Sequence, residues 1–197
     1  MKLSKSQKID IINTFKEKIV SKDEILNVIC DVIQDKLESK KVFDSLRKIN
    51  KIRFVFQKYY YIVSEEERGN KIIKYSNLDL IASVLNRLNV KWYLGLASAN
   101  DLNKVIWQPS NNIYIINNKY SKTIKINDQK VFFSRLKSDF IMGYTKHITP
   151  SRIQLNISSN EKTYVDYEYL KKEMPIELRD KVDLDKVFEI KTKLKWK

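Results

Sequence analysis

Few residues in this chain have the types and spacing that catalysis requires. The sequence contains one cysteine, Cys30, and one histidine, His147. A structural zinc site needs about four such ligands, and a Ser-His-Asp or Cys-His mechanism would depend on His147 alone. We therefore expect no metal site, no cofactor and no catalytic residue of these kinds. We interpret Cys30 as a packing residue and His147, which lies near a proline, as a solvated loop residue.

A group of carboxylates near residue 190 keeps an enzymatic alternative open. Asp183 and Asp185 precede the tripeptide Glu189-Ile-Lys191. On neighbouring strands, such carboxylates hold Mg²⁺ while the lysine lies near the scissile phosphate of a nucleic acid. The tripeptide is common in a lysine-rich chain, however, and no hairpin separates it from the two aspartates. A non-enzymatic protein is our principal expectation, and a magnesium-dependent nuclease is the alternative.

The stretch KWYLGLASAN, residues 91–100, also invites a chemical interpretation. It has one glycine and no Gly-Lys-Ser/Thr sequence, so it is not a phosphate-binding loop. Ser98 lacks the flanking glycines of a nucleophile elbow. We expect a short strand-like entry at residues 92–94 that leads into a helix. On that helix, Gly95, Ser98 and Ala99 would form a narrow face that packs closely against a sheet.

The charge balance indicates a polyanionic partner. The 197-residue chain has 38 Lys and Arg against 24 Asp and Glu, a formal net charge of +14. Such an excess is typical of proteins that bind nucleic acid or an anionic membrane surface, although a lysine-rich proteome gives the same composition. The sequence has neither an apolar run of bilayer-spanning length nor the pattern of a secretory signal at its start. We therefore expect a cytoplasmic protein.

The first 64 residues predict three helices and a hairpin. Apolar residues recur at helical spacing, and Ser6, Ser21 and Ser39 are expected helix caps, with Glu24 completing a capping box. Two β-rich runs separated by two residues predict the hairpin. The expected elements are helices over 6–17, 21–33 and 39–50 and a hairpin over 51–63. This order is that of a winged helix-turn-helix, whose third helix enters the DNA major groove and whose hairpin is the wing.

Basic residues concentrate on the third predicted helix. Residues 1–64 carry 14 basic and eight acidic side chains, a net charge of +6, and six of the basic ones lie within 36–51. With Val42, Leu46 and Ile49 facing inward, polar side chains would face outward, where they can contact phosphates or base edges. The expected DNA-binding residues, from this helix and the wing, are Ser39, Lys40, Lys41, Asp44, Ser45, Lys48, Arg53, Lys58 and Tyr59. The alternative is a solvated basic helix in a winged domain that binds protein.

An acidic segment, residues 64–71, predicts a linker that divides the chain. We expect a winged helix-turn-helix domain over 1–66 and a mixed α+β domain over 71–197. In the second domain, alternating and β-branched runs predict a small antiparallel sheet flanked by helices. The expected elements are helices over 77–89 and 159–173, strands over 112–117, 121–127, 130–136 and 152–157, and a turn at 127–129. Residues 185–197 are ambiguous between strand and helix.

These features together resemble a known family. An N-terminal winged helix, the stretch WYLGLASA and the later β-rich run IYIINNKYSKTIKINDQKVFFSRL are similar to the abortive-infection AbiEi family of antitoxins and transcriptional regulators. The segment ISSNEKTYVDYEYL, with Thr163 and Asp166 in a Thr-x-x-Asp pattern, resembles the family's entry into a C-terminal helix. The resemblance covers roughly residues 5–175. It departs after Ala99, where NDLNKV replaces the aromatic or His residue and Gly-Leu that members often have.

The resemblance implies the antitoxin of a type IV toxin–antitoxin system. The winged domain would bind inverted repeats of double-stranded DNA in its own promoter, with a homodimer on the DNA, and would repress its operon. The second domain would support dimerisation, DNA positioning or neutralisation of a nucleotidyltransferase-like toxin. Toxin and antitoxin of this family are generally thought not to form a stable complex, so direct contact is not implied. A plain transcription factor or an adaptor without a toxin is the alternative.

Overall fold

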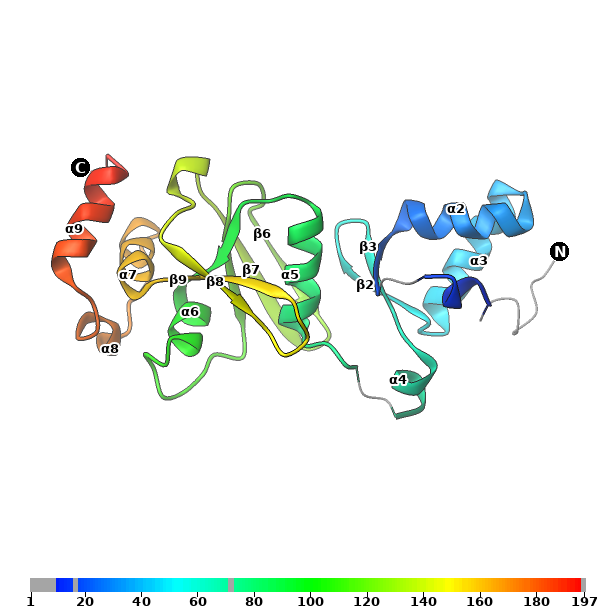
Figure 1. Cartoon of the computed structure of the whole chain (residues 1–197), viewed down its shortest axis with the longest axis horizontal. Coiled ribbons are helices and arrows are strands. Elements are labelled where there is room, and N and C mark those ends of the chain that lie inside the picture. The colour runs from blue at the N-terminus through cyan, green and yellow to red at the C-terminus, as the bar shows by residue number, and fades with distance from the viewer. Residues whose placement is uncertain (1–9, 16–17, 71–72, 196–197) are drawn as a thin grey trace. The chain divides into compact units, whose positions relative to one another are not determined.

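A computed structural model of the chain describes residues 10–15, 18–70 and 73–195. The chain divides into two compact units, Met1–Ser76 and Asn77–Lys197 (Figure 1). Each unit combines helices with a sheet, three-stranded in the first unit and six-stranded in the second, and each has its own hydrophobic core. The α+β class expected from the sequence is therefore confirmed.

The first unit combines helices with a small antiparallel sheet. Its elements are β1 (Ile19–Ser21), α2 (Lys22–Ile33), α3 (Lys36–Lys48), β2 (Ile52–Phe56), β3 (Tyr59–Ile62) and α4 (Glu65–Asn70). Residues 10–13, within the expected first helix, are helical, whereas its expected cap Ser6 lies outside the described residues. The sheet has the order β1-β3-β2. The sequence predicts the hairpin and the two helices before it, but not β1, because three residues are too few to show alternation.

The expected capping box at the start of α2 is confirmed. The amide of Glu24 donates to Ser21 Oγ at 3.1 Å, and the amide of Ser21 donates to Glu24 Oε2 at 2.6 Å. Ser21 is also the last residue of β1, where it pairs with Tyr59. The cap therefore turns the chain directly from the sheet into the helix.

The start of α3 differs from the sequence prediction. Asp35, not Ser39, caps this helix, because its Oδ1 accepts hydrogen bonds from the amides of Leu37 at 2.7 Å and Glu38 at 3.0 Å. The bonds from Glu38 and Leu37 hold the pKa of the Asp35 carboxyl below its ordinary value. Since α3 ends at Lys48, Ile49 leaves the inward-facing stripe expected of it and is 46% exposed.

Helices α2 and α3 pack against the sheet through one apolar core. Ile25, Ile29 and Leu46 are fully buried in this core. Phe43 of α3 meets Tyr60 of β3 edge to face, with 5.1 Å between ring centroids, a geometry that aromatic pairs favour. This packing fixes which side of α3 is buried and leaves the other side to solvent.

Helix α4 occupies the segment expected to be a linker. The amide of Glu67 donates to Ser64 Oγ at 3.2 Å and the amide of Ser64 donates to Glu67 Oε2 at 2.8 Å, which is a second capping box. The other carboxylate oxygen of Glu67 accepts bonds from Tyr61 Oη and from the amide of Lys74, the latter at 2.8 Å. The first unit therefore extends to Ser76, because Glu67 holds the residues around Lys74 to the sheet.

The second unit contains a mixed sheet with the strand order β6-β7-β5-β4-β9-β8. Its elements are α5 (Asn77–Arg87), β4 (Trp92–Leu94), α6 (Leu96–Leu102), β5 (Ile113–Asn117), β6 (Lys122–Ile126), β7 (Gln129–Arg135), η1 (Ser138–Phe140), β8 (Tyr144–Ile148), β9 (Gln154–Ser158), α7 (Asn160–Tyr169), α8 (Ile176–Arg179) and α9 (Leu184–Lys193). The four strands and two helices expected here are confirmed to within a few residues.

The expectation of a purely antiparallel sheet is wrong. Strand β5 pairs in parallel with β7, and β4 pairs in parallel with β9. The β6–β7 hairpin places β7 next to β5 and leaves β6 at the edge, so β5 and β7 run in the same direction. Alternation of apolar residues sets which face of a strand is buried and says nothing about the direction of its neighbour.

The stretch at residues 91–100 forms the structural joint that the sequence predicts. Strand β4 ends at Leu94, Gly95 is the N-cap residue of α6, and Ala99 is fully buried. A Cβ atom on Gly95 would lie only 2.6 Å from Cδ1 of Ile116 on the neighbouring strand β5. Ser98 Oγ accepts a hydrogen bond from the amide of Tyr114 at 2.8 Å. The small residues therefore allow α6 to lie closely against β5.

Candidate nucleic-acid interface

The outer face of α3 carries most of the expected DNA-contacting side chains. Lys40, Lys41, Asp44 and Lys48 are exposed and Ser45 is half-buried. Positions four residues apart lie above one another on a helix, so the side chains at positions 40, 44 and 48 form one row. The buried residues of α3 lie on its opposite side and fix this row toward solvent.

Ion pairs occupy some of these charges and leave others available. Lys41 Nζ lies 3.1 Å from Glu38 Oε2, and Asp44 Oδ1 lies 3.7 Å from Arg47 Nη1. Both pairs are largely exposed, and such pairs contribute little to stability. Lys40 and Lys48 form no ion pair within the described part of the chain. They lie about 12 Å apart along the helix axis at a rise of about 1.5 Å per residue.

Ser39, although expected from the sequence to contact DNA, does not belong to this surface. Its side chain is buried, and its hydroxyl donates to the carbonyl oxygen of Asp35 at 2.6 Å. The position lies on the same side of α3 as Val42, Phe43 and Leu46, which face the core. Ser39 therefore packs within the unit and is not a DNA-contacting residue of this face.

The three expected contact residues of the hairpin differ in their exposure to solvent. Lys58, at the turn, is exposed and lies 3.7 Å from Asp23 Oδ2, again a weak surface pair. Arg53 and Tyr59 are half-buried, and Arg53 Nε is enclosed without a hydrogen bond among the described residues. Phe54, which was not among the expected contact residues, is 50% exposed on β2. Of the three expected wing residues, Lys58 is thus the one that is exposed.

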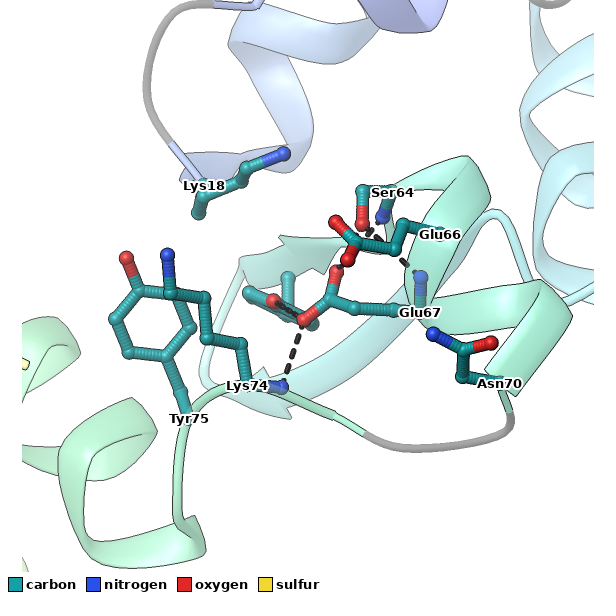
Figure 2. Close-up of a pocket in the computed structure, with 8 residues that line it drawn as sticks. Lys18, Ser64, Glu66, Glu67, Asn70, Lys74 and Tyr75 are labelled. Carbon is teal, nitrogen blue, oxygen red and sulfur yellow. Dashed lines mark hydrogen bonds between the residues drawn. The ribbon is translucent and has the colours of Figure 1, made fainter.

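A pocket of about 450 Å³ lies beside α4 (Figure 2). Lys18 and Lys74 line it together with Glu66 and Glu67, so its charges balance. Burial alone would raise the pKa of the Glu67 carboxyl, but hydrogen bonds from Tyr61, Lys74 and Ser64 outweigh burial and lower it. Figure 2 shows Glu67 bonded to Ser64 and Lys74 across the pocket. These bonds give Glu67 a structural role.

The Thr-x-x-Asp pattern of α7 lies in the interior of the second unit. Thr163 Oγ1 donates to the Ser159 carbonyl at 2.8 Å and lies 2.7 Å from Ser158 Oγ. Asp166 forms a buried ion pair with Lys162. Thr163 holds α7 to the end of β9 through Ser158, and Thr163, Asp166 and Lys162 are all buried.

Tyr93 completes a buried polar triad with Lys162 and Asp166. Lys162 Nζ donates to Tyr93 Oη at 2.8 Å, and Tyr93 Oη donates to Asp166 Oδ2 at 2.8 Å. Burial lowers the pKa of Lys162 and raises the pKa of Asp166 relative to their ordinary values. The mutual attraction of the two charges opposes both shifts. The triad joins β4 to α7 and is absent from the sequence-based expectations, because a lysine is usually assigned to the surface.

The carboxylates considered for a nuclease lie at one helix, not on neighbouring strands. Asp183 is the N-cap residue of α9, and its Oδ1 accepts bonds from the amides of Asp185 at 3.1 Å and Lys186 at 3.4 Å. Glu189 is exposed in the middle of α9. Within the described residues, no three His, Cys, Asp or Glu side chains are grouped closely enough to hold a metal ion. The strand geometry that this alternative requires does not occur at these positions.

His147 lies on strand β8 instead of in the expected loop. It is exposed, with its Nε2 2.9 Å from Thr145 Oγ1. His147 therefore has no acidic partner of the kind that a catalytic histidine uses, as far as the described contacts extend.

Comparison with known proteins adds no relative. No model of a known protein family matches the chain, and no curated protein matches it. In the described part of the chain, no helix combines the length and apolar character needed to cross a bilayer.

Proposed function

We propose that this protein is a DNA-binding transcriptional repressor that acts as the antitoxin of a type IV toxin–antitoxin system. The element order supports a winged helix-turn-helix: a helix, strand β1, helices α2 and α3, then the β2–β3 hairpin. In that arrangement α3 is the recognition helix and the hairpin is the wing. The resemblance of the sequence to the AbiEi family supports the antitoxin role, including repression of its own operon and opposition to a nucleotidyltransferase-like toxin.

The observation that carries the DNA-binding part is the outer face of α3. The helix is fixed by an apolar core on one side, and on the other it presents Lys40 and Lys48 without ion-pair partners in the described chain. Lysine side chains bind phosphates and guanine edges. The formal net charge of +14 favours encounter with a polyanion.

A binding titration at several salt concentrations tests the proposal. The probe is a labelled duplex from the region upstream of the protein's own gene, with a duplex of unrelated sequence for comparison. Because each neutralised phosphate contributes about 0.9 to the slope of log K against log salt, Lys40→Ala/Lys48→Ala should reduce that slope by about 2. The matched control is Lys137→Ala/Lys172→Ala, which removes two exposed lysines of the second unit that form no ion pair among the described residues.

Several results would contradict the proposal. If the wild type shows no salt-sensitive binding, the winged unit serves as a protein-binding adaptor. If both double variants reduce the slope equally, net charge and not the α3 face binds the DNA. Cleavage of plasmid DNA with Mg²⁺ that is lost in Glu189→Ala would instead establish a nuclease. The antitoxin role is tested separately, by co-expression with a nucleotidyltransferase-like protein encoded next to the gene, whose growth arrest this chain should relieve.

A further inference from the structure

The second unit contains a polar pocket that is separate from the α3 face and from the buried triad. Its volume is about 360 Å³. Val90, Trp92 and Tyr144 line it together with six polar residues, which are Asn86, Asn89, Lys91, Lys146, Gln154 and Asn156. They come from the last turn of α5, from the segment that leads to β4, from the start of β4 and from the paired strands β8 and β9. The pocket is open to solvent and not enclosed.

Hydrogen bonds hold the amide side chains of the pocket in fixed orientations. Asn86 Oδ1 accepts a bond from Trp92 Nε1 at 2.9 Å, and its Nδ2 donates to the Gln154 carbonyl at 3.1 Å. Asn156 Nδ2 donates to the Trp92 carbonyl at 2.9 Å, while its Oδ1 accepts from Gln154 Nε2 at 3.2 Å. Trp92 itself is 1% exposed, so its ring is part of the core and unavailable for stacking. The floor of the pocket is therefore rigid and polar.

The charge of the pocket is entirely positive. Lys91, which precedes β4, and Lys146 of β8 both line it, and no aspartate or glutamate lines it. Both lysines are exposed and neither forms an ion pair within the described residues. Asn89, also exposed, adds an amide donor. Two ammonium groups and an amide donor around one concave, acid-free surface attract an anion with several acceptor oxygens.

We propose that this pocket binds a phosphate of a nucleic-acid backbone and is a second DNA contact of the protein. The inference rests on the proposed function, which makes DNA the partner, and extends it to the second unit. A phosphodiester has the required charge and acceptors, and a strand that lies across an open pocket needs no apolar walls around it. Small enclosed ligands are mostly surrounded by apolar and aromatic side chains, whereas in this open pocket Val90 and Trp92 are buried and Tyr144 is half-buried.

The test compares two double variants of the full chain in the same duplex titration. Lys91→Ala/Lys146→Ala should reduce the slope of log K against log salt by about 0.9, because the contact with one phosphate is lost. Lys137→Ala/Lys172→Ala removes the same charge outside the pocket and should leave the slope close to that of the wild type. Asn156→Asp places a carboxylate in the floor and should weaken binding without removing a lysine. Tryptophan fluorescence checks that each variant is folded, since Trp92 lies beside the pocket.

The outcomes separate this inference from the proposed function. If the wild type binds DNA but Lys91→Ala/Lys146→Ala behaves like the control pair, the pocket is not a contact and only the further inference fails. If the wild type binds no duplex, both fail. If the pocket variant loses binding of a free mononucleotide and keeps its duplex slope, the site takes a small phosphorylated ligand instead, and the backbone contact is overturned.

Discussion

The buried triad of the second unit gives the sharpest test of the structure. Lys162 is 0% and Asp166 1% exposed, and Tyr93 Oη bonds to both. Asp166→Asn removes one charge and leaves the Lys162 ammonium buried without a counter-charge. Lys162→Met does the reverse and leaves the Asp166 carboxylate alone. Breaking a buried pair from one side typically costs about 3–5 kcal/mol.

The cost of each single variant has a ceiling that depends on pH. A buried lysine without a counter-charge can lose its proton. This costs about 1.4 kcal/mol for each pH unit below the ordinary lysine pKa of about 10.4, so the largest cost at pH 7 is about 5 kcal/mol. A stranded aspartate can take up a proton, and its ordinary pKa of about 3.9 sets a ceiling of about 4 kcal/mol at the same pH. Either loss is a large part of the roughly 5–15 kcal/mol that stabilises a domain.

The two single variants should therefore respond to pH in opposite directions. In Asp166→Asn the folded pKa of Lys162 lies further below its unfolded value, so the unfolded state binds more protons and stability recovers as pH rises from 7 toward 9. In Lys162→Met the folded pKa of Asp166 lies above its unfolded value, so stability recovers as pH falls from 7 toward 5. The double variant Lys162→Met/Asp166→Leu leaves no buried charge and should recover most of the stability at every pH.

Urea unfolding followed by tryptophan fluorescence measures these changes in the correct unit. All three tryptophans, at positions 92, 107 and 196, belong to the second unit. The matched control is Glu189→Gln, which breaks an exposed pair with Lys193 at the same four-residue spacing and should change stability by at most about 0.5 kcal/mol. If Asp166→Asn changes stability as little as this control, or if both single variants have the same pH slope, the buried triad is wrong.

Three other residues give tests of the packing and caps. Gly95→Val should destabilise the second unit by about 1–3 kcal/mol through overpacking against Ile116, while duplex binding by α3 is spared; normal melting would exclude the close contact. Glu67→Gln should make the stability of the first unit less sensitive to acid. The lowered pKa of Glu67 contributes stability at pH values above its ordinary pKa of about 4.3, and this stability is lost as pH falls through the folded pKa. The amide signals of β3 during an acid titration measure this loss. Ser21→Ala should cost about 1 kcal/mol by removing the α2 cap, as measured by unfolding followed by circular dichroism.

The helix starts show both the strength and the limit of prediction from the sequence. The Ser-x-x-Glu spacing predicts the cap at Ser21 correctly, and the same spacing at Ser64 and Glu67 also forms a capping box. The acidic run and Gly69 that follow Ser64 predict a linker instead, and the bond from Tyr61 that holds Glu67 is not visible in the sequence. At α3, Asp35 is the cap and Ser39 lies within the first turns of the helix, where its hydroxyl donates to the Asp35 carbonyl oxygen.

Contacts between distant segments account for most of what the sequence does not predict. The parallel pairing of β5 with β7 depends on where the β6–β7 hairpin folds back. The pocket at Lys91 and Lys146 depends on the neighbouring positions of the α5–β4 segment and β8 in space. The exposed row on α3, by contrast, follows from helical spacing alone, and the sequence predicts it except for Ser39 and Ile49.

The two sequence patterns that resemble the AbiEi family are joined by one contact in the structure. Tyr93 belongs to the small-residue stretch and Asp166 to the Thr-x-x-Asp pattern, and their side chains are hydrogen-bonded at 2.8 Å across 73 residues of sequence. Because the two patterns form a single buried cluster, they are not two independent pieces of evidence for the function of the family. They describe how the second unit packs, and a protein with the same core and another function would keep both. The distinction between a repressor and an adaptor therefore depends on Lys40 and Lys48. Both lysines are exposed on α3 and contribute nothing to that core, so the fold does not require a lysine at either position.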